Sequence, residues 1–223
     1  MKLVRAHTRQ SIFRTASYAL LPIGSIACGG DRFNSLRNLG STREAIVGLG
    51  DSLTEGVGAN PGGAYPAVLS RELAFPVVNQ GRRSDTTADA LARLSEVLER
   101  DPRLVIVLLG GNDFLRQVPR RETKKNLAEV VRRLQDHGAM VAIAGMRLGL
   151  FTDEFSPIYK ETAEQFGAYY IPQVMQGILS DPQLKSDPIH PNAAGYRLLG
   201  QPIAEKLKPL LREADRLTGR RGV

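Results

Sequence analysis

The chain has 223 residues, a length typical of one domain with a single hydrophobic core. Hydrophobic residues make up 42% and charged residues 24%, which excludes a disordered chain. The formal net charge is +7, but four of the basic residues lie in positions 1–27, which hold no acid, so the remainder carries only +3. That remainder has no basic stripe with interleaved aromatic residues, and we therefore expect no nucleic-acid partner.

Residues 1–27 have the pattern of a signal peptide. A basic segment reaches Arg14, and the apolar stretch after it is too short to span a bilayer. Ser25 and Ala27 are small residues suitably placed for a cut before Cys28, the only cysteine. We expect an exported protein, either periplasmic or anchored in the membrane through lipidation of Cys28. One position departs from the lipoprotein pattern, since such signals usually carry Leu where Ser25 stands. The alternative is an uncleaved flexible tail in which Cys28 is incidental.

The remaining chain divides by composition into three parts. Residues 28–43 are rich in Gly, Ser, Asn and Arg and lack apolar periodicity, which predicts a flexible tether. Residues 44–212 should form the folded domain, and residues 213–223 a polar tail. We expect this domain to be a monomer.

Within the domain, short runs rich in β-branched residues alternate with segments of helical period. The expected strands cover 45–49, 75–79, 104–109, 140–144 and 168–171, and the clearest helices lie around 91–98, 127–134 and 196–210. The third strand is apolar throughout, as in a strand buried on both faces. This alternation predicts an α/β fold with a parallel sheet between two layers of helices. Functional sites in such sheets lie beyond the carboxyl ends of the strands.

Polar side chains stand at two of those strand ends. The first strand leads into Gly50-Asp51-Ser52, where a serine hydroxyl would open into the cleft beside a helix N-terminus. Alone, this tripeptide also suits an ordinary N-capped helix. The third strand ends in Gly110-Gly111-Asn112-Asp113, where small residues admit a ligand and the Asn112 amide can donate to an oxyanion. Asn112 is otherwise a common turn residue.

An acid and an imidazole lie three residues apart near the C-terminus. In the segment Asp187-Pro188-Ile189-His190, the carboxylate can fix the imidazole tautomer and stabilise the imidazolium. His7 lies in the leader and His137 at an expected helix end, so His190 is the best candidate for a general base. His190 has no clustered partner ligands, and we expect neither a metal nor a cofactor.

Four segments together resemble the sequence blocks of the SGNH/GDSL hydrolase family. They are Gly50–Leu53, Asn79–Ser84, Gly110–Asp113 and Asp187–His190, in this order and at similar spacing. Within that family the chain looks most similar to the small bacterial arylesterases, acyl-CoA thioesterases and lysophospholipases. The resemblance implies a flavodoxin-like, three-layer α/β/α fold with five parallel strands in the order 2-1-3-4-5. It also implies Ser52 as nucleophile, His190 as base, Asp187 as orienting acid, and Ser52, Ser84 and Asn112 as oxyanion-hole donors.

One position departs from the family pattern. The second-block donor is usually Gly, and here it is Ser84. A backbone N–H survives this change, although Ser would be strained if the position required positive φ. Because Arg82 and Arg83 stand beside it, we expect an ordinary backbone region. If Ser84 instead spoiled the oxyanion hole, the chain would be a non-catalytic binding module.

The substrate is predicted only as a class. Gly111, Phe114, Leu148 and Phe151 lie on loops at the active end and suit the acyl chain of an ester, a thioester or a lysophospholipid, although such residues also pack under loops. The expected function is therefore a serine esterase or thioesterase. The alternative is a carbohydrate or cell-wall O-acetyl esterase.

Overall fold

The computed structural model describes residues 33–60, 62–148, 153 and 155–220. The signal peptide expected over residues 1–27 and the candidate lipidation site Cys28 lie outside the described residues. In the part of the chain that is described, no helix is both long enough and apolar enough to cross a membrane.

A parallel sheet of five strands forms the middle layer, with the order β2-β1-β3-β4-β5. The strands are β1 (Ala45–Gly50), β2 (Val77–Gly81), β3 (Pro102–Leu108), β4 (Met140–Ala144) and β5 (Tyr169–Ile171). Every neighbouring pair is parallel. These findings confirm the predicted flavodoxin-like α/β fold.

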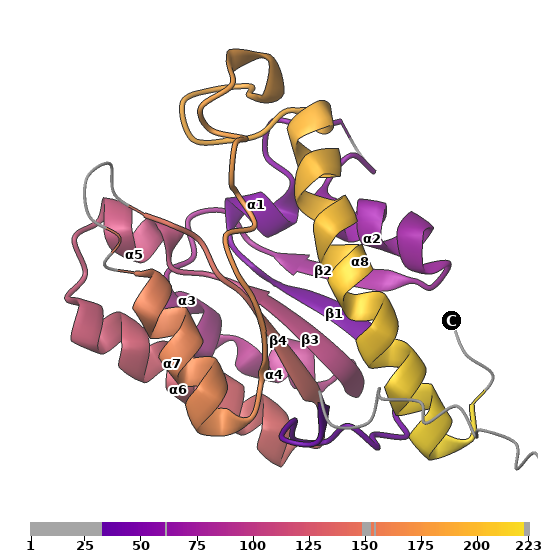
Figure 1. The fold of residues 1–223 in the computed structure, drawn as a ribbon. Helices are drawn as coiled ribbons and strands as arrows, with labels where there is room; N and C mark the ends of the chain where they lie inside the picture. Colours follow the sequence, from indigo (N-terminus) through magenta and orange to yellow (C-terminus); the bar gives the residue numbers. More distant parts are fainter. Residues whose placement is uncertain (1–32, 61, 149–152, 154, 221–223) are drawn as a thin grey trace, which may run out of the picture.

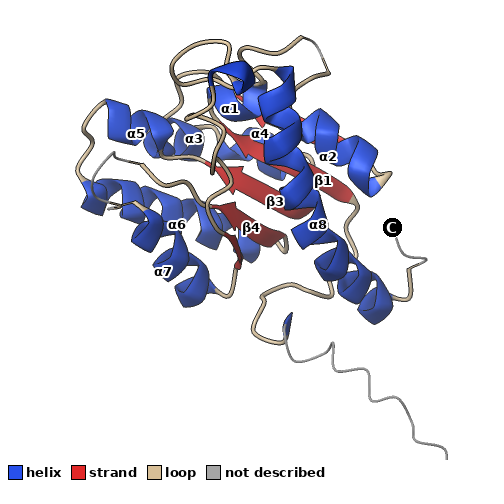
Figure 2. Ribbon diagram, turned by 45° about the horizontal axis from the view of Figure 1, so that its top comes forward, coloured by secondary structure: helices blue, strands red, loops and turns tan. Residues whose placement is uncertain are grey.

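Helices cover both faces of this sheet (Figures 1 and 2). On one face α2 (Tyr65–Leu73) packs against the long last helix, α8 (Ala193–Thr218). On the other face α6 (Arg120–Asp136) lies between α3 (Thr87–Ala92) and α7 (Ser156–Phe166). Three short helices lie in the connections: α1 (Ser52–Glu55), α4 (Leu94–Leu98) and α5 (Gly111–Leu115).

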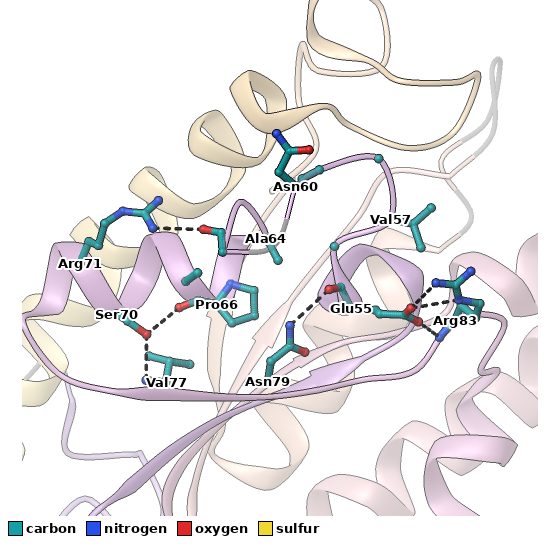
Figure 3. A pocket seen from close by; sticks show the side chains of 15 residues that line it. Glu55, Val57, Asn60, Ala64, Pro66, Ser70, Arg71, Val77, Asn79 and Arg83 are labelled. Carbon is teal, nitrogen blue, oxygen red and sulfur yellow. Dashed lines mark hydrogen bonds and ion pairs between the residues drawn. The ribbon is translucent and has the colours of Figure 1, made fainter.

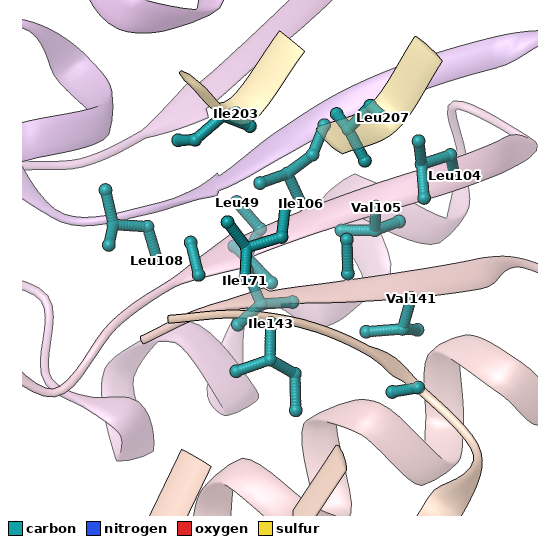
Figure 4. Close-up of a cluster of buried hydrophobic side chains, with 14 of the residues drawn as sticks. Leu49, Leu104, Val105, Ile106, Leu108, Val141, Ile143, Ile171, Ile203 and Leu207 are labelled. Atoms are coloured by element: carbon teal, nitrogen blue, oxygen red, sulfur yellow. The ribbon is translucent and has the colours of Figure 1, made fainter. Parts of the chain in front are cut away.

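The centre of the core is β3, in which all seven residues are buried. It lies between β1 and β4, and helices cover both of its faces, so its side chains have no route to water. Figure 4 shows Leu104 and Ile106 of β3 beside Ile203 and Leu207 of α8. Burying an aliphatic side chain of this size contributes roughly 1.5–3 kcal/mol. This rigid layer fixes the strand ends, where the polar segments lie.

Residues 33–43 are not the flexible tether that composition predicted. Phe33 is only 4% exposed, and its ring meets Tyr169 edge to face with the centroids 5.9 Å apart. The Asn38 side-chain amide donates to the carbonyls of Gln135 and Ala139 over 2.7 and 2.9 Å. Arg37 and Arg43 add ion pairs with Asp136 and Asp101, so apolar, amide and charged groups of this segment all bind the domain.

The predicted end of the domain at residue 212 was also wrong. Helix α8 continues to Thr218, with Ala214 and Asp215 buried. Asp215 forms an ion pair with Arg103, which is 2% exposed at the start of β3. A polar sequence at the end of the chain therefore completes the core at the amino ends of the strands.

Candidate active site

Ser52 lies at the corner where the first strand gives way to the first helix. β1 ends at Gly50 and α1 begins at Ser52, and between them the Asp51 carboxylate accepts the Leu53 N–H over 3.0 Å as an N-cap. The corner requires glycine at position 50, because a Cβ there would lie 2.5 Å from the Leu108 carbonyl oxygen. The serine therefore stands beyond the carboxyl ends of the strands.

Ser52, His190 and Asp187 form a continuous hydrogen-bonded chain. His190 Nε2 lies 3.0 Å from Ser52 Oγ, and His190 Nδ1 lies 2.7 Å from Asp187 Oδ2. A proton on Nδ1 is favoured by the carboxylate, which leaves the Nε2 lone pair facing the serine hydroxyl. The structure thus brings together the three residues expected to act as nucleophile, base and acid, although 138 positions separate Ser52 from His190.

The Asp187 carboxylate is held in its charged form. Its Oδ1 accepts the backbone N–H groups of Ile189 and His190, each over 2.9 Å. Desolvation pushes the pKa of Asp187 upward, but the hydrogen bonds from Ile189 and His190 together outweigh it and hold the pKa below its ordinary value. The acid therefore stays ionised and available to stabilise an imidazolium.

A second carboxyl group, Asp51, lies buried behind the serine. It is 2% exposed, and desolvation raises its pKa to about 6, although the hydrogen bond from Leu53 and the charge of His190 act in the opposite direction. Its Oδ2 lies 3.4 Å from Asn112 Nδ2. Asp51 therefore titrates close to the reacting groups without contacting Ser52 Oγ in any described hydrogen bond.

Asn112, near the start of α5, lines the same cavity as Ser52. One N–H donates to the Asp85 carbonyl over 2.9 Å, which fixes the plane of the amide. The other is directed at the Asp51 carboxylate over 3.4 Å, at the limit of hydrogen-bond distance. That second N–H is therefore available to an incoming oxygen atom.

Ser84 has a backbone conformation that the sequence did not predict. It lies in the β2–α3 loop, residues 82–86, with φ of +68°, where an ordinary region was expected. That expectation was wrong, because Arg82 and Arg83 have exposed side chains paired with Glu96 and Glu55, and such residues are compatible with a neighbour at positive φ. Among the described residues, no acceptor binds the N–H of Ser84 or of Ser52.

A cavity of about 900 Å³ opens beside the serine. Its lining includes Ser52, His190 and Asn112, together with the expected residues Gly111, Phe114 and Leu148. Phe151, also expected there, lies outside the described residues. The wall is mainly apolar, which matches the general character of small-molecule sites. This volume and lining suit a hydrocarbon chain.

Sequence reasoning missed part of this wall. Met146 follows β4, Met175 and Leu179 follow β5, and Ile189 stands beside the histidine. The rule that points to strand ends could have found Met146. However, the segment after β5 carries no motif, and nothing in its sequence shows that it folds back over the cavity.

A second cavity, of about 770 Å³, is lined by residues of α1, α2 and β2 and of the segments that follow α1 and β2 (Figure 3). Its lining includes Glu55, Val57, Asn60, Arg71 and Arg83 but none of Ser52, His190 and Asn112. Most of its side-chain polar groups already have partners in the protein, as the dashed lines of Figure 3 show. We place the chemistry in the first cavity, because only that one contains the serine and the imidazole.

The described residues contain no cluster of three or more His, Cys, Asp or Glu side chains arranged to hold a metal ion. The groups gathered at the strand ends are instead a hydroxyl, an imidazole, a carboxylate and free N–H donors. This combination, on a parallel sheet of this topology, is the site of a serine hydrolase.

Comparison with known proteins gives the family. The profile of the GDSL-like lipase/acylhydrolase family matches residues 49–198, so the chain belongs to that family. It is 31% identical over 180 residues to esterase TesA of Pseudomonas aeruginosa, covering 75% of this chain and 90% of the relative. It is 31% identical over 177 residues to thioesterase 1/protease 1/lysophospholipase L1 of Escherichia coli K12, covering 75% and 85%. A crystal structure of TesA superposes with a TM-score of 0.71 at 31% identity, covering 75% of this chain and 100% of that one. The protein is therefore a serine hydrolase that acts on acyl esters.

Proposed function

We propose that the protein hydrolyses acyl esters and thioesters with apolar acyl chains, through an acyl-enzyme on Ser52. The observation that carries this proposal is the contact of 3.0 Å between Ser52 Oγ and His190 Nε2 at the mouth of the apolar cavity. Relatives named esterase and thioesterase/lysophospholipase support the choice of substrates.

In the acylation step, Ser52 Oγ attacks the acyl carbonyl carbon while His190 Nε2 takes the hydroxyl proton. Asp187 stabilises the resulting imidazolium through Nδ1. The carbonyl oxygen becomes an oxyanion, which accepts the N–H groups of Ser52 and Ser84 and the Asn112 N–H that otherwise forms the long contact with Asp51. The intermediate then collapses: the bond from the acyl carbon to the leaving oxygen or sulfur breaks, His190 gives its proton to the departing alcohol or thiol, and the acyl group stays on Ser52 Oγ.

In the deacylation step, water takes the place of the leaving group. His190 removes a proton from the water as it attacks the acyl carbon, and the same three donors hold the second oxyanion. Collapse of this intermediate breaks the bond to Ser52 Oγ, and the serine recovers its proton from His190. The released product is the carboxylic acid.

The substrate proposal is tested by a profile of hydrolysis rates. We expect kcat/KM to rise from p-nitrophenyl acetate to the octanoate ester, and acyl-CoA and lysophospholipid to be hydrolysed. Acetylated sugars hydrolysed faster than any long-chain ester would favour an O-acetyl esterase instead. A serine-directed phosphonate that fails to label Ser52 would favour a non-catalytic binding module.

We also propose that the protein is exported, cleaved after Ala27 and anchored through a lipidated Cys28, with a monomeric hydrolase domain. The basic segment, the short apolar stretch and the small residues before Cys28 support this proposal. Mass spectrometry of the mature N-terminus tests both cleavage and lipidation, and light scattering tests the oligomeric state. A cytosolic protein that retains Met1 would contradict export.

A further inference from the structure

The β2–α3 loop leaves one backbone amide free. Four of its five amides are bonded: Arg82 N–H to Gly50 O over 3.0 Å, Arg83 N–H to the Glu55 carboxylate over 2.5 Å, Asp85 N–H to Arg82 O over 3.2 Å, and Thr86 N–H to the Asp89 carboxylate over 2.9 Å. Only the N–H of Ser84 has no acceptor among the described residues. This donor therefore has no partner in the described part of the protein, as its proposed role toward the oxyanion requires.

This arrangement is unfavourable for serine. A residue with a side chain at φ of +68° is strained relative to the extended or right-handed region. Without outside contacts, the peptide bond that carries the Ser84 N–H would tend to rotate, because another backbone region relieves the strain. Something in the surrounding structure must therefore hold the loop.

The Ser84 N–H belongs to the peptide bond between residues 83 and 84. Two side chains hold the peptide bonds next to it, the one between residues 82 and 83 and the one between residues 84 and 85. Before it, the Glu55 carboxylate accepts the Arg83 N–H and also binds the Arg83 guanidinium over 2.5 and 2.9 Å (Figure 3). After it, the Arg116 guanidinium donates to the Ser84 carbonyl over 2.7 Å. With both neighbouring peptide bonds fixed, the bond between them has little freedom to rotate.

Both side chains come from elements that carry proposed catalytic groups. Glu55 is the last residue of α1, which begins at Ser52, and Arg116 caps α5, which contains Asn112. The contacts therefore set the position of the Ser84 donor relative to the nucleophile and the other side-chain donor. They lie near the surface, since the side chains of Glu55 and Arg116 are 30% and 51% exposed.

We propose that Glu55 and Arg116 are positioning residues that hold Ser84 in its strained conformation and keep its N–H directed at the oxyanion. This inference rests on the proposed function, in which Ser84 donates to the oxyanion. Neither residue contacts Ser52, His190 or Asp187 in any described hydrogen bond. Their effect is on the geometry of the donor.

The test compares Glu55→Ala and Arg116→Ala with the wild type in hydrolysis of p-nitrophenyl butyrate. We expect each to lower kcat by about tenfold with KM unchanged, because misplacing one donor removes part of its transition-state contribution. The rate of phosphonylation of Ser52 should fall in parallel. Glu55→Gln should keep most of the activity, because its amide oxygen can still accept the Arg83 N–H.

The matched control is Arg121→Ala. Arg121 is 89% exposed, contacts only its neighbour Glu122 in the described ion pairs, and lies outside both cavities. The substitution Arg121→Ala removes one positive charge, as Arg116→Ala does, and should leave kcat and KM unchanged. Equal melting temperatures for the wild type and the three alanine variants would show that the kcat effect is not loss of folded protein.

A second comparison places the same changes in a Ser84→Gly background. Glycine takes positive φ without strain, so the loop depends less on outside contacts. We expect Ser84→Gly to restore part of the kcat that Glu55→Ala and Arg116→Ala lose. An undiminished loss of kcat in that background, or an effect on KM alone, would overturn the proposal.

Ser52→Ala separates the two levels of inference. Hydrolysis of the ester by the wild type but not by Ser52→Ala would support the proposed function. If Glu55→Ala and Arg116→Ala then match the wild type, the positioning role is refuted and the proposed function stands. If Ser52→Ala turns over the ester like the wild type, the proposed function fails and the positioning role falls with it.

Discussion

The Asn112 side chain donates to the Asp85 carbonyl over 2.9 Å, and this bond joins the β3–α5 turn to the β2–α3 loop. Asn112 is thereby oriented by the same loop that contains Ser84. We predict that Asn112→Ala lowers kcat by about 10²–10³, because an oxyanion donor acts mainly in the transition state. Steady-state kinetics on p-nitrophenyl butyrate should show little change in KM. A higher KM at unchanged kcat would mean that Asn112 binds the ground state.

Ser52→Ala should abolish ester hydrolysis in a folded protein. The loss in kcat should be of order 10³-fold or more, because nucleophile and base act as one unit. Circular dichroism and the melting temperature should stay those of the wild type, since the Asp51 cap and the α1 backbone do not depend on the hydroxyl. Near-normal turnover in this variant would contradict the mechanism.

Ser84→Gly should stabilise the protein. Relief of the left-handed strain should raise the free energy of unfolding by about 1–2 kcal/mol. The extra entropy of glycine in the unfolded chain should lower it by about 0.4–1 kcal/mol. The net expectation is a rise of about 0.5–1 kcal/mol in the free energy of unfolding, measured by urea denaturation. Loss of the side chain should also favour bulkier acyl groups in the rate profile. A destabilised Gly variant would indicate that φ at this position is not positive in solution.

Asp51 should make the stability of the protein depend on pH. Burial raises its pKa to about 6 from 3.8, so between these values the native state holds a proton that the unfolded state has lost. Stability from this group is therefore full below about pH 4 and falls by about 3 kcal/mol as the pH rises through 6.

The variant that tests this is Asp51→Asn, which keeps an oxygen to cap Leu53 but carries no charge. We expect it to be more stable than the wild type at about pH 7.5 and similar to it at about pH 4. Urea denaturation of both proteins at the two pH values gives the difference between their free energies of unfolding. The contributions of the other titrating groups cancel in this difference. A difference that does not vary with pH would show that the pKa of Asp51 is not raised.

Ending the chain at residue 212 should destabilise it strongly. The truncation removes Asp215 and leaves the Arg103 guanidinium buried without its carboxylate partner, which costs about 3–5 kcal/mol. Loss of the buried Ala214 adds to this effect. Adding Arg103→Met to the truncated chain should restore part of the free energy of unfolding. A truncated chain as stable as the full one would show that residues 213–218 are dispensable.

The sequence was sufficient for the sheet and for the segments that gather at its carboxyl ends. Apolar runs such as 104–109 identify buried strands, and parallel strands must bring Ser52 and Asn112 to one edge, so their proximity follows from topology. The backbone of Ser84 could not be predicted in this way. It depends on contacts from Glu55 and Arg116, which no local pattern around Ser84 reveals.

Arg93 shows why local patterns fail at such positions. Leu91, Leu94 and Leu98 predicted one helix, but the helix is interrupted at Arg93 between α3 and α4. The Arg93 side chain is 7% exposed, pairs with Asp85 over 2.6 Å and donates to the Gly50 and Gln80 carbonyls. A buried guanidinium at a helix break is set by tertiary contacts. The same applies to Phe33 and Asp215, whose partners lie more than a hundred residues away.

Both ends of the described chain leave the domain at the same pole. Phe33 packs on Tyr169 at the start of β5, and Arg220 near the other end donates to the Thr42 carbonyl, just before β1. The cavity with Ser52 opens at the opposite pole, beyond the carboxyl ends of the strands. A bead, a fusion partner or any other surface joined directly at residue 33 or residue 220 would therefore face the closed side of the molecule. The mouth of the cavity would point away from the attachment and into the surrounding solution.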